Sequence, residues 1–298
     1  MGLSSELMRE CLNAATAAAY RAGARVMSHY GRSVDVGSKG REHLAGDVVT
    51  VADHEAQEAI LDVVAGLSPD IGILAEEEGQ DAGRSRFEKE CFWCIDPLDG
   101  TLPFLERSNG FAVSIALVSR SGEPLMGVVY APAFGDLYHA VAGGKAYKNG
   151  EPLSVGRAQG TLHLSTSAND AIPPARNEAL NHVMKGLSGL KRIQKTGPVL
   201  HGGAVIKACW VCENPPACYL SLPRPDGGVS VWYCAATACI VKAAGGWVSD
   251  LFGRPLELNR RESTFMHHRG LLYASDDELA RTVIEGYAGW ERSERSTR

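Results

Sequence analysis

Acidic side chains follow two short apolar runs in the first third of the chain. Residues 71–75 run directly into Glu76, and residues 92–95 run into Asp96 and, three residues later, Asp99. Because adjacent strands that end at one edge of a sheet deliver their last side chains to one place, we expect these three acids to meet. Converging carboxylates repel one another unless a cation lies between them. Oxygen ligands suit a hard ion, so the pattern predicts a site for Mg²⁺, with Mn²⁺ possible, rather than for zinc.

The residues between and after the two aspartates suit a phosphate ester. Pro97 restricts the backbone, so the Leu98 carbonyl oxygen could also face a metal ion. Gly100 and Thr101 suit the start of a helix, where free N–H groups can hold a phosphate. A metal site directly beside an anion site is what the hydrolysis of a phosphate ester needs. The alternative is structural, because the two aspartates could simply form a turn and cap a helix.

Hydrophobic spacing predicts the elements that carry these residues. Apolar residues at helical spacing predict helices over residues 4–30, 48–67 and 235–244. Runs of β-forming residues between turns predict an antiparallel meander with strands over 111–118, 126–132, 137–142 and 146–148. Beyond about residue 156, helices and strands alternate. We therefore expect an α+β half over residues 1–155 with the metal and phosphate site, and an α/β half over 156–298 that contributes substrate-binding loops.

Composition excludes several classes of protein. The 298 residues are 45% hydrophobic and 22% charged, which is typical of a globular protein. With 30 Lys and Arg against 35 Asp and Glu, the formal net charge is -5, so the sequence shows no basic footprint for a nucleic acid polymer. It holds no run of roughly 18 apolar residues, the length that a membrane span needs. Since the N-terminus shows no signal-peptide pattern, we expect a cytoplasmic protein.

Longer motifs resemble the inositol monophosphatase superfamily, which includes bisphosphate nucleotidases. The matching stretches are 47–53, 74–77, 93–101, 111–117, 127–132, 232–237 and 243–246. The run from Asp96 to Thr101, Asp-Pro-Leu-Asp-Gly-Thr, is the most specific of them. The resemblance implies an inositol monophosphatase-like five-layer αβαβα sandwich, and superfamily members often form homodimers.

The resemblance also implies a role for each matching residue. Glu76, Asp96, Asp99 and the Leu98 carbonyl would hold the metal ions, and the Gly100 and Thr101 amides would hold the phosphate. Glu76, Asp53 and Thr101 would form the catalytic group. In it, the Asp53 carboxylate pairs with the Thr101 hydroxyl and helps to orient and deprotonate a metal-bound water. Lys39 or Arg41 would lie in the loop that covers such a site.

One position departs from the family pattern. The family has an aspartate directly after the tryptophan of its C-terminal motif, where it ligates the second metal, whereas this chain has Tyr233 after Trp232. A neutral phenol is a poor ligand for Mg²⁺. Either Asp226 substitutes, although its Gly-rich neighbours favour a turn residue, or the enzyme works with fewer metals or a lower rate. In the third alternative the protein binds a phosphorylated ligand or has acquired another reaction.

Two residues of the second half could contact a substrate, Lys195 at a phosphate and His201 at the organic part. Lys195 ends a basic run that could grip a second phosphate, although such runs are more often solvated, and His201 lies where the family tends to contact substrate. The sequence therefore predicts a Mg²⁺-dependent phosphomonoesterase that hydrolyses a small phosphorylated polyol, sugar or nucleotide by metal-activated water. The alternative is a phosphatase-like protein whose hydrolysis is weakened or lost because of Tyr233. Neither alternative involves a nucleic acid polymer or a membrane.

Overall fold

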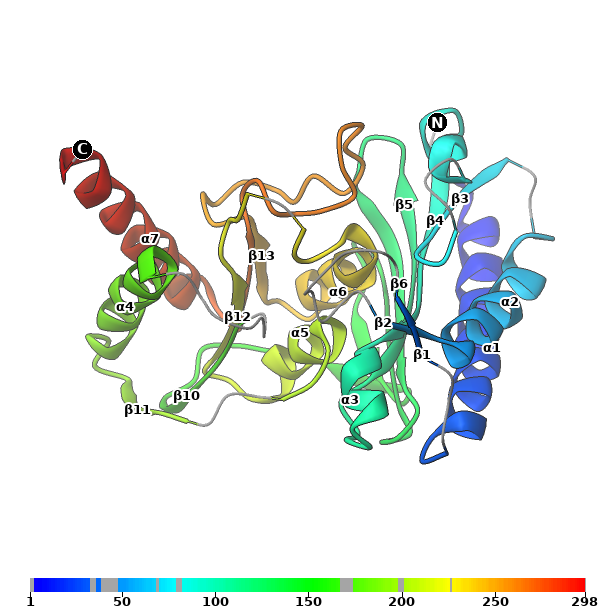
Figure 1. Ribbon diagram of the computed structural model, residues 1–298, viewed down its shortest axis with the longest axis horizontal. Helices are drawn as coiled ribbons and strands as arrows, with labels where there is room; N and C mark the ends of the chain where they lie inside the picture. Colours follow the sequence, from blue (N-terminus) through cyan, green and yellow to red (C-terminus); the bar gives the residue numbers. More distant parts are fainter. Residues whose placement is uncertain are drawn as a thin grey trace.

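Five layers of alternating helices and sheets stack along the long axis of the molecule (Figure 1). The computed structural model describes residues 3–32, 36–38, 48–67, 70–78, 82–166, 174–197, 201–225 and 227–297. Helices α1 (Ser5–His29) and α2 (Val51–Val64) form one outer layer, and α4 (Pro174–Ser188) and α7 (Asp277–Thr297) form the other. Helices α5 (Ala204–Glu213) and α6 (Val231–Ala243) lie between the two sheets. The expected αβαβα sandwich is confirmed.

A seven-stranded sheet carries the predicted acids. Its strands are β3 (Ile71–Ala75), β4 (Cys91–Asp99), β5 (Ala112–Ser119), β6 (Pro124–Ala131), β7 (Asp136–Val141), β8 (Ala146–Lys148) and β9 (Glu151–Leu153), in that spatial order. Strands β3 and β4 are parallel, with the 3₁₀ helix η2 (Ala82–Phe87) in their connection, and every later pair is antiparallel. Because β3 and β4 run in the same direction, both end at the same edge of the sheet.

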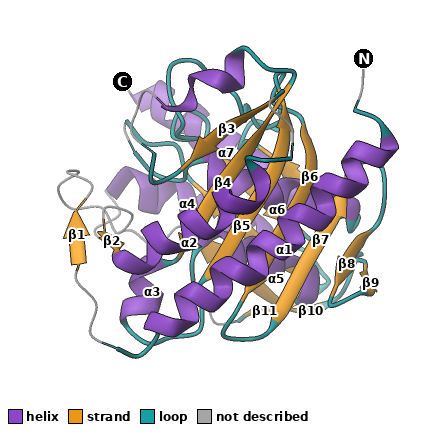
Figure 2. Cartoon of the chain, turned by 90° about the vertical axis from the view of Figure 1, so that its right-hand side faces the viewer, coloured by secondary structure: helices purple, strands orange, loops and turns teal. Residues whose placement is uncertain are grey.

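Helix α1 lies across one face of this sheet, beside α2 (Figure 2). Ser4 caps its first turn by accepting a hydrogen bond from the Leu7 amide at 3.1 Å. The buried face consists mainly of small residues, Cys11, Ala15, Ala18, Ala19 and Ala22. Small side chains allow the helix to approach its neighbours closely, so the periodicity of alanine, rather than of large apolar residues, defines this layer.

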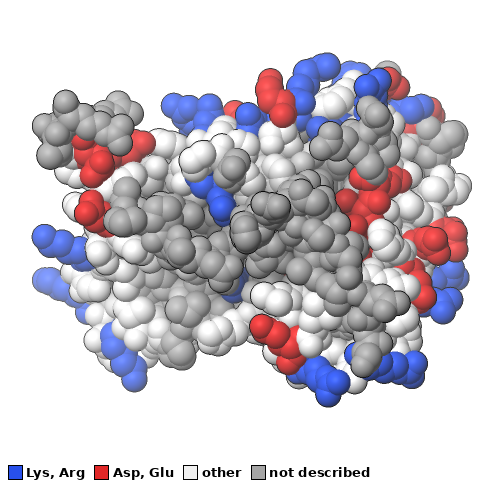
Figure 3. All heavy atoms as spheres, viewed as in Figure 1, with Lys and Arg blue, Asp and Glu red and all other residues white. Residues whose placement is uncertain are grey.

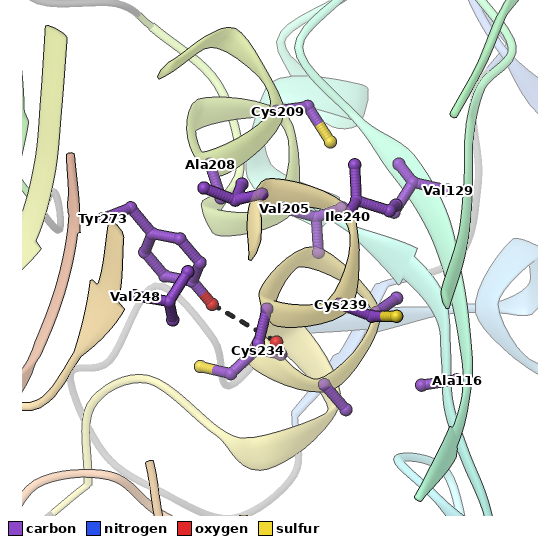
Figure 4. Packing of buried hydrophobic residues seen from close by; sticks show 14 of the residues in the cluster. Ala116, Val129, Val205, Ala208, Cys209, Cys234, Cys239, Ile240, Val248 and Tyr273 are labelled. Atoms are coloured by element: carbon purple, nitrogen blue, oxygen red, sulfur yellow. Dashed lines mark hydrogen bonds between the residues drawn. The ribbon is translucent and has the colours of Figure 1, made fainter. Parts of the chain in front are cut away.

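Helices α5 and α6 pack against both sheets at once. Figure 4 shows Ile240 beside Val129 of the large sheet, while Tyr273 of the second sheet donates a hydrogen bond to the Cys234 carbonyl at 3.2 Å. All residues of α6 from Val231 to Val241 except Tyr233 are buried. A helix that is apolar around its whole circumference is stable only inside such a double contact. Tyr233 is the one residue of this stretch that is not fully buried, so its surroundings are informative.

The second sheet has five strands, in the order β11-β10-β12-β14-β13. These strands are β10 (Gly160–Thr166), β11 (Ile193–Thr196), β12 (Ala217–Ser221), β13 (Trp247–Ser249) and β14 (Leu271–Ala274). One continuous core spans both sheets, since Phe92 of β4 and Tyr273 of β14 belong to the same buried cluster. The division of the chain into two domains near residue 156 stays a prediction.

Some element boundaries differ from those expected. Residues 48–50 form the short strand β2 (Val48–Thr50), paired with β1 (Val36–Ser38), and only then does α2 begin. Thr50 caps α2 and sets its start, a polar feature that hydrophobic spacing does not report. Helix α6 begins at Val231 rather than 235, because its first turn is buried too. Strand β4 continues through both aspartates to Asp99.

Charge and hydropathy in the structure agree with the composition. On the face in Figure 3, acidic and basic side chains of the described residues are interspersed, without an extended basic stripe. Within the same residues, no helix is both long and apolar enough to cross a membrane. All eight cysteines are free and buried.

Candidate active site

The parallel pairing of β3 and β4 places the predicted acids at one sheet edge. Ala75 is in register with Ile95, and the Glu76 amide donates to the Ile95 carbonyl at 3.1 Å. Glu76 therefore leaves β3 beside the point where β4 reaches Asp96. The pairing of β4 with β5 is irregular between Asp96 and Asp99, where Pro97 has no N–H to donate.

A tight local turn holds the two aspartates. The Leu98 amide donates to Asp96 Oδ1 at 2.9 Å, and both aspartates are almost fully buried. Gly100, at a φ of 86°, then turns the chain into the short helix α3 (Thr101–Leu105). A left-handed φ favours glycine, because a Cβ would be strained there. The alternative in which the two aspartates form a turn and cap the following helix is therefore only partly correct. Asp96 stabilises a turn, but neither aspartate caps α3.

Asp99 instead caps a helix from the other half of the chain. Its Oδ1 accepts from the Ala204 amide at 3.0 Å, and its Oδ2 accepts from the Val205 amide at 2.8 Å, at the N-terminus of α5. Burial raises the pKa of Asp99 to about 7; the two amides oppose this, while the Glu76 charge adds to it. Asp99 therefore joins the acidic cluster to α5.

Asp53 and Thr101 form a second polar unit. Asp53 lies in the first turn of α2, where its Oδ2 accepts from the Thr50 amide at 2.8 Å and from the Thr50 hydroxyl at 2.7 Å. This reciprocal capping box locks the carboxylate orientation. Its Oδ1 lies 3.3 Å from the Thr101 hydroxyl, which is also 3.3 Å from the Leu98 carbonyl oxygen. Asp53 and Thr101 are therefore paired, and their catalytic roles stay predictions.

Tyr233 enters the same cluster from the first turn of α6. Its hydroxyl donates to Glu76 Oε1 at 3.0 Å. Burial, followed by the charges of Glu76, Asp96 and Asp99, raises the pKa of the Tyr233 phenol well above its usual value. The phenol is neutral at physiological pH and acts here as a hydrogen-bond donor to a carboxylate. Tyr233 thus contacts Glu76 without adding a negative charge to the cluster.

The sequence analysis did not predict Lys207, a buried lysine near Asp99. Lys207 of α5 is almost fully buried and donates to the Thr166 carbonyl at 3.2 Å. Burial lowers the pKa of this ammonium, and the charge of Asp99 acts in the opposite direction. The signal in the sequence is a single charge inside an apolar helix, which is rare unless the charge is compensated.

The donor set of the cluster fits a hard divalent cation. Glu76, Asp96, Asp99 and the Leu98 carbonyl provide oxygen donors only, which excludes a thiolate or imidazole site. Within the described residues, however, no group of three His, Cys, Asp or Glu side chains is already arranged to hold a metal ion. Asp99 accounts for part of this, because both of its oxygens accept hydrogen bonds from α5.

Within the described residues, no hydrogen bond or ion pair joins Lys195 or His201 to the acids, although the backbone of residues 201–203 packs against Gly110 and, at Gly203, against the Asp99 carboxylate. Lys195 is exposed on β11, an edge strand of the second sheet. His201 is exposed just before α5, and two residues later the Gly203 amide donates to the Gly110 carbonyl at 2.8 Å. Substrate roles for Lys195 and His201 stay predictions. Lys39, Arg41 and Asp226 lie outside the described residues.

Known proteins share both sequence and fold with this chain. The family model described as "Inositol monophosphatase family" matches residues 7–286. A 3'(2'),5'-bisphosphate nucleotidase CysQ of Escherichia coli O157:H7 is 34% identical over 251 residues, covering 82% of this chain and 92% of the relative. An inositol-1-monophosphatase of Mesorhizobium japonicum is 32% identical over 256 residues, covering 81% and 86%.

Solved structures agree with these relatives. A Thermotoga maritima IMPase superposes with a TM-score of 0.70 at 26% identity, covering 94% of this chain and 98% of that one. CysQ from Bacteroides thetaiotaomicron gives a TM-score of 0.66 at 26% identity, covering 92% and 98%. The protein is thus a phosphoric monoester hydrolase of the metal-dependent class that acts on small phosphorylated substrates. With the match spanning almost its whole length, the chain belongs to the inositol monophosphatase family.

Proposed function

We propose that this protein is a Mg²⁺-dependent phosphomonoesterase for a small phosphorylated polyol, sugar or nucleotide, built on the cluster of Glu76, Asp96 and Asp99. The observation that carries the proposal is the meeting of Glu76, the buried Asp96 and Asp99, and the Asp53–Thr101 pair at one sheet edge. Relatives named as a bisphosphate nucleotidase and an inositol-1-monophosphatase support the range of substrates.

Glu76, Asp96, Asp99 and the Leu98 carbonyl would hold the cation. When bound, Mg²⁺ would neutralise phosphate charge and lower the pKa of a coordinated water. Asp99 reaches this set only if it shares its oxygens with the α5 amides. Each carboxylate oxygen has more than one lone pair, so such sharing is chemically reasonable.

Thr101 and Asp53 would position the attacking water and receive its proton. The Thr101 hydroxyl, hydrogen-bonded to Asp53 Oδ1, keeps lone pairs with which it can accept a hydrogen bond from water. Asp53 is held by Thr50 and cannot rotate freely, so its orientation is set before substrate binds. The Gly100 and Thr101 amides are the proposed phosphate contacts.

Tyr233 favours a site with fewer metal ions than the family pattern implies. The neutral phenol hydrogen-bonds to Glu76 in the position where the family places an aspartate ligand. Its donation uses a lone pair of Glu76 that a metal would otherwise use. A reduced metal complement and a lower rate are therefore the second candidate.

The test is phosphate release from inositol, sugar and nucleoside phosphates, with Mg²⁺ or with EDTA. The wild type should release phosphate only with Mg²⁺, and Asp96→Asn should reduce the rate by at least about 100-fold because it removes a buried charge from the cation site. Asp70→Asn, at the exposed start of β3, is the matched control and should retain the wild-type rate. Full activity of a folded Asp96→Asn variant would place the metal elsewhere and contradict the proposal.

We also propose a cytoplasmic homodimer, on resemblance to the superfamily. Sedimentation equilibrium should then give twice the chain mass of 31.9 kDa. A monomer mass throughout the concentration range would contradict the dimer and leave the proposed chemistry unaffected.

A further inference from the structure

A cavity of about 540 Å³ lies between the end of β3, near Glu76, and the helix η2. Its walls come from β3, η2, the start of α6 and residues 261–265. In Figure 1 the loop that contains 261–265 is the orange segment after β13, which reaches across to the large sheet. Glu76 is the only member of the proposed active site in the described lining, since Asp53, Asp96, Asp99 and Thr101 do not contribute to it.

The side chain of Arg86 is the unusual feature of this cavity. Arg86 is only 6% exposed, and one nitrogen, Nη2, donates to the Arg260 carbonyl at 3.1 Å. Its Nε and Nη1 are buried and have no hydrogen-bond partner within the described chain. Among the same residues no carboxylate lies within ion-pair distance of this guanidinium. A buried cation with two unused donors is unfavourable unless a ligand satisfies it.

Aromatic stacking fixes the guanidinium group in place. The Arg86 guanidinium lies over the Phe87 ring at 4.4 Å from its centroid, and the Arg261 guanidinium lies over the same ring at 4.9 Å. Asn259 donates to the Arg86 carbonyl at 3.3 Å and holds the loop to η2. Two guanidinium groups are therefore stacked on one ring beside the cavity, with little freedom to find partners elsewhere.

The acids around the cavity do not neutralise Arg86. Arg84, Arg86 and Arg261 line it together with Glu76, Glu78 and Glu262. Glu76 accepts from Tyr233, and Glu262 lies 3.7 Å from Arg260 rather than beside Arg86. The planar fork of a guanidinium matches two oxygens of a carboxylate, sulfate or phosphate.

We infer that the Arg86 cavity binds one small oxyanion per chain, in a site separate from the carboxylate cluster. The ligand would be a sulfate, a phosphate or a carboxylate held by Arg86 and Arg261. Because Glu76 lines the cavity and also belongs to the carboxylate cluster, occupancy of the anion site should influence the cation site. The inference goes beyond hydrolysis, since anion binding here requires neither a metal nor turnover.

Calorimetric titration of the full chain with sulfate in EDTA tests the inference. The wild type should bind one sulfate per chain, and Arg86→Gln should weaken binding by at least about tenfold. Arg261→Gln, at a more exposed position, should weaken it by a smaller factor and guards against misfolding of the Arg86 variant. Arg9→Gln on α1 is the matched control, with wild-type affinity expected. Circular dichroism should first establish that each variant is folded.

Measuring sulfate binding and phosphate release on the same variants separates the anion site from the proposed phosphatase site. Asp96→Asn should retain sulfate affinity even when phosphate release is lost, because it does not line the cavity. Titration with inorganic phosphate and with glycerol phosphate then distinguishes a free anion from an anionic group on a larger molecule. Arg86-dependent binding of either supports the site. The absence of saturable binding to the wild type, or binding that both Arg86→Gln and Arg261→Gln leave unchanged, would overturn the inference.

Discussion

Two side chains determine how the acidic cluster differs from a simple metal cage. Asp99 uses both oxygens to cap α5, and Tyr233 donates to Glu76. The first contact links the cluster to the second half of the chain, and the second neutralises none of its charge. Both contacts reduce the number of carboxylate lone pairs that face a cation.

Tyr233→Asp should restore a carboxylate at this position and increase cation binding. Without metal, a fourth acid beside Glu76, Asp96 and Asp99 should lower the melting temperature through repulsion. With Mn²⁺ the order should reverse, because a ligand that binds the folded state stabilises it. Electron paramagnetic resonance of Mn²⁺ should count more bound ions in the variant, and Mg²⁺-dependent phosphate release should rise by about tenfold or more.

Tyr233→Phe is the control for this exchange, since it removes the hydrogen bond to Glu76 and keeps the ring. It frees the Glu76 lone pair without adding a carboxylate, so a Mn²⁺ count in Tyr233→Asp above that of Tyr233→Phe is due to the new ligand. An equal Mn²⁺ count in the folded Tyr233→Asp and wild-type proteins would show that position 233 does not limit the metal complement.

Close contact between α6 and β6 positions Tyr233 at the level of secondary structure. A Cβ built on Gly127 of β6 would overlap the backbone of Ala236, one turn beyond Tyr233. Helix α6 therefore lies directly on β6. This position brings Tyr233, in the first turn of α6, next to Glu76 at the end of β3. The depth of this contact sets the distance between the phenol and Glu76.

Gly127→Ala should consequently destabilise the protein strongly. Overpacking a close backbone contact costs about 1–3 kcal/mol, and more when both partners are backbone. Urea denaturation should show this loss in the free energy of unfolding. Gly156→Ala, where a Cβ meets no atom within 4 Å, is the matched control and should change stability by less than about 0.5 kcal/mol. A Gly127→Ala variant as stable as the control would mean that α6 lies farther from β6.

At the scale of the whole molecule, a polar loop ties the two sheets together. Arg86 contacts the Arg260 carbonyl, and Glu257 anchors the base of the same loop through His268 at 2.8 Å and Arg269 at 2.7 Å. Burial acts to raise the pKa of Glu257, but the His268 hydrogen bond and the charges of Arg269 and Arg260 outweigh it, so the pKa is lowered. Ionised Glu257 therefore stabilises the folded state.

Glu257→Gln should reduce stability at neutral pH and not in acid. The lowered pKa means that the wild-type advantage is present above the ordinary glutamate value and is lost as pH falls through the folded-state pKa. Because the side chain is 41% exposed, solvent screening limits the effect at neutral pH to about 1 kcal/mol or less. Urea denaturation at a series of pH values measures it, with exposed Glu88→Gln as control. A difference that persists at pH 3 would contradict the assigned charge interaction.

The acids at the strand ends and most of the sandwich follow from local pattern. The two apolar runs predict β3 and β4, and their parallel pairing carries Glu76 and Asp96 to one edge of the sheet, although β4 continues beyond the expected end at Ile95 to Asp99. Capping residues are less visible, and for that reason the expected helix over 48–67 included the β2 strand and missed the boundary at Thr50. A hydrophobic period reports which face is buried, and it does not report where polar caps begin a helix.

Contacts between distant residues were decided only by the tertiary structure. Tyr233 meets Glu76 across 157 positions, and Arg86 meets Arg260 across 174. Such contacts depend on how closely α6 lies on β6 and on where a loop of one half crosses to the other. Local sequence specifies which side chains leave an element and in which direction. The distance between two elements, and therefore which polar groups pair across it, is set by the packing of the whole core.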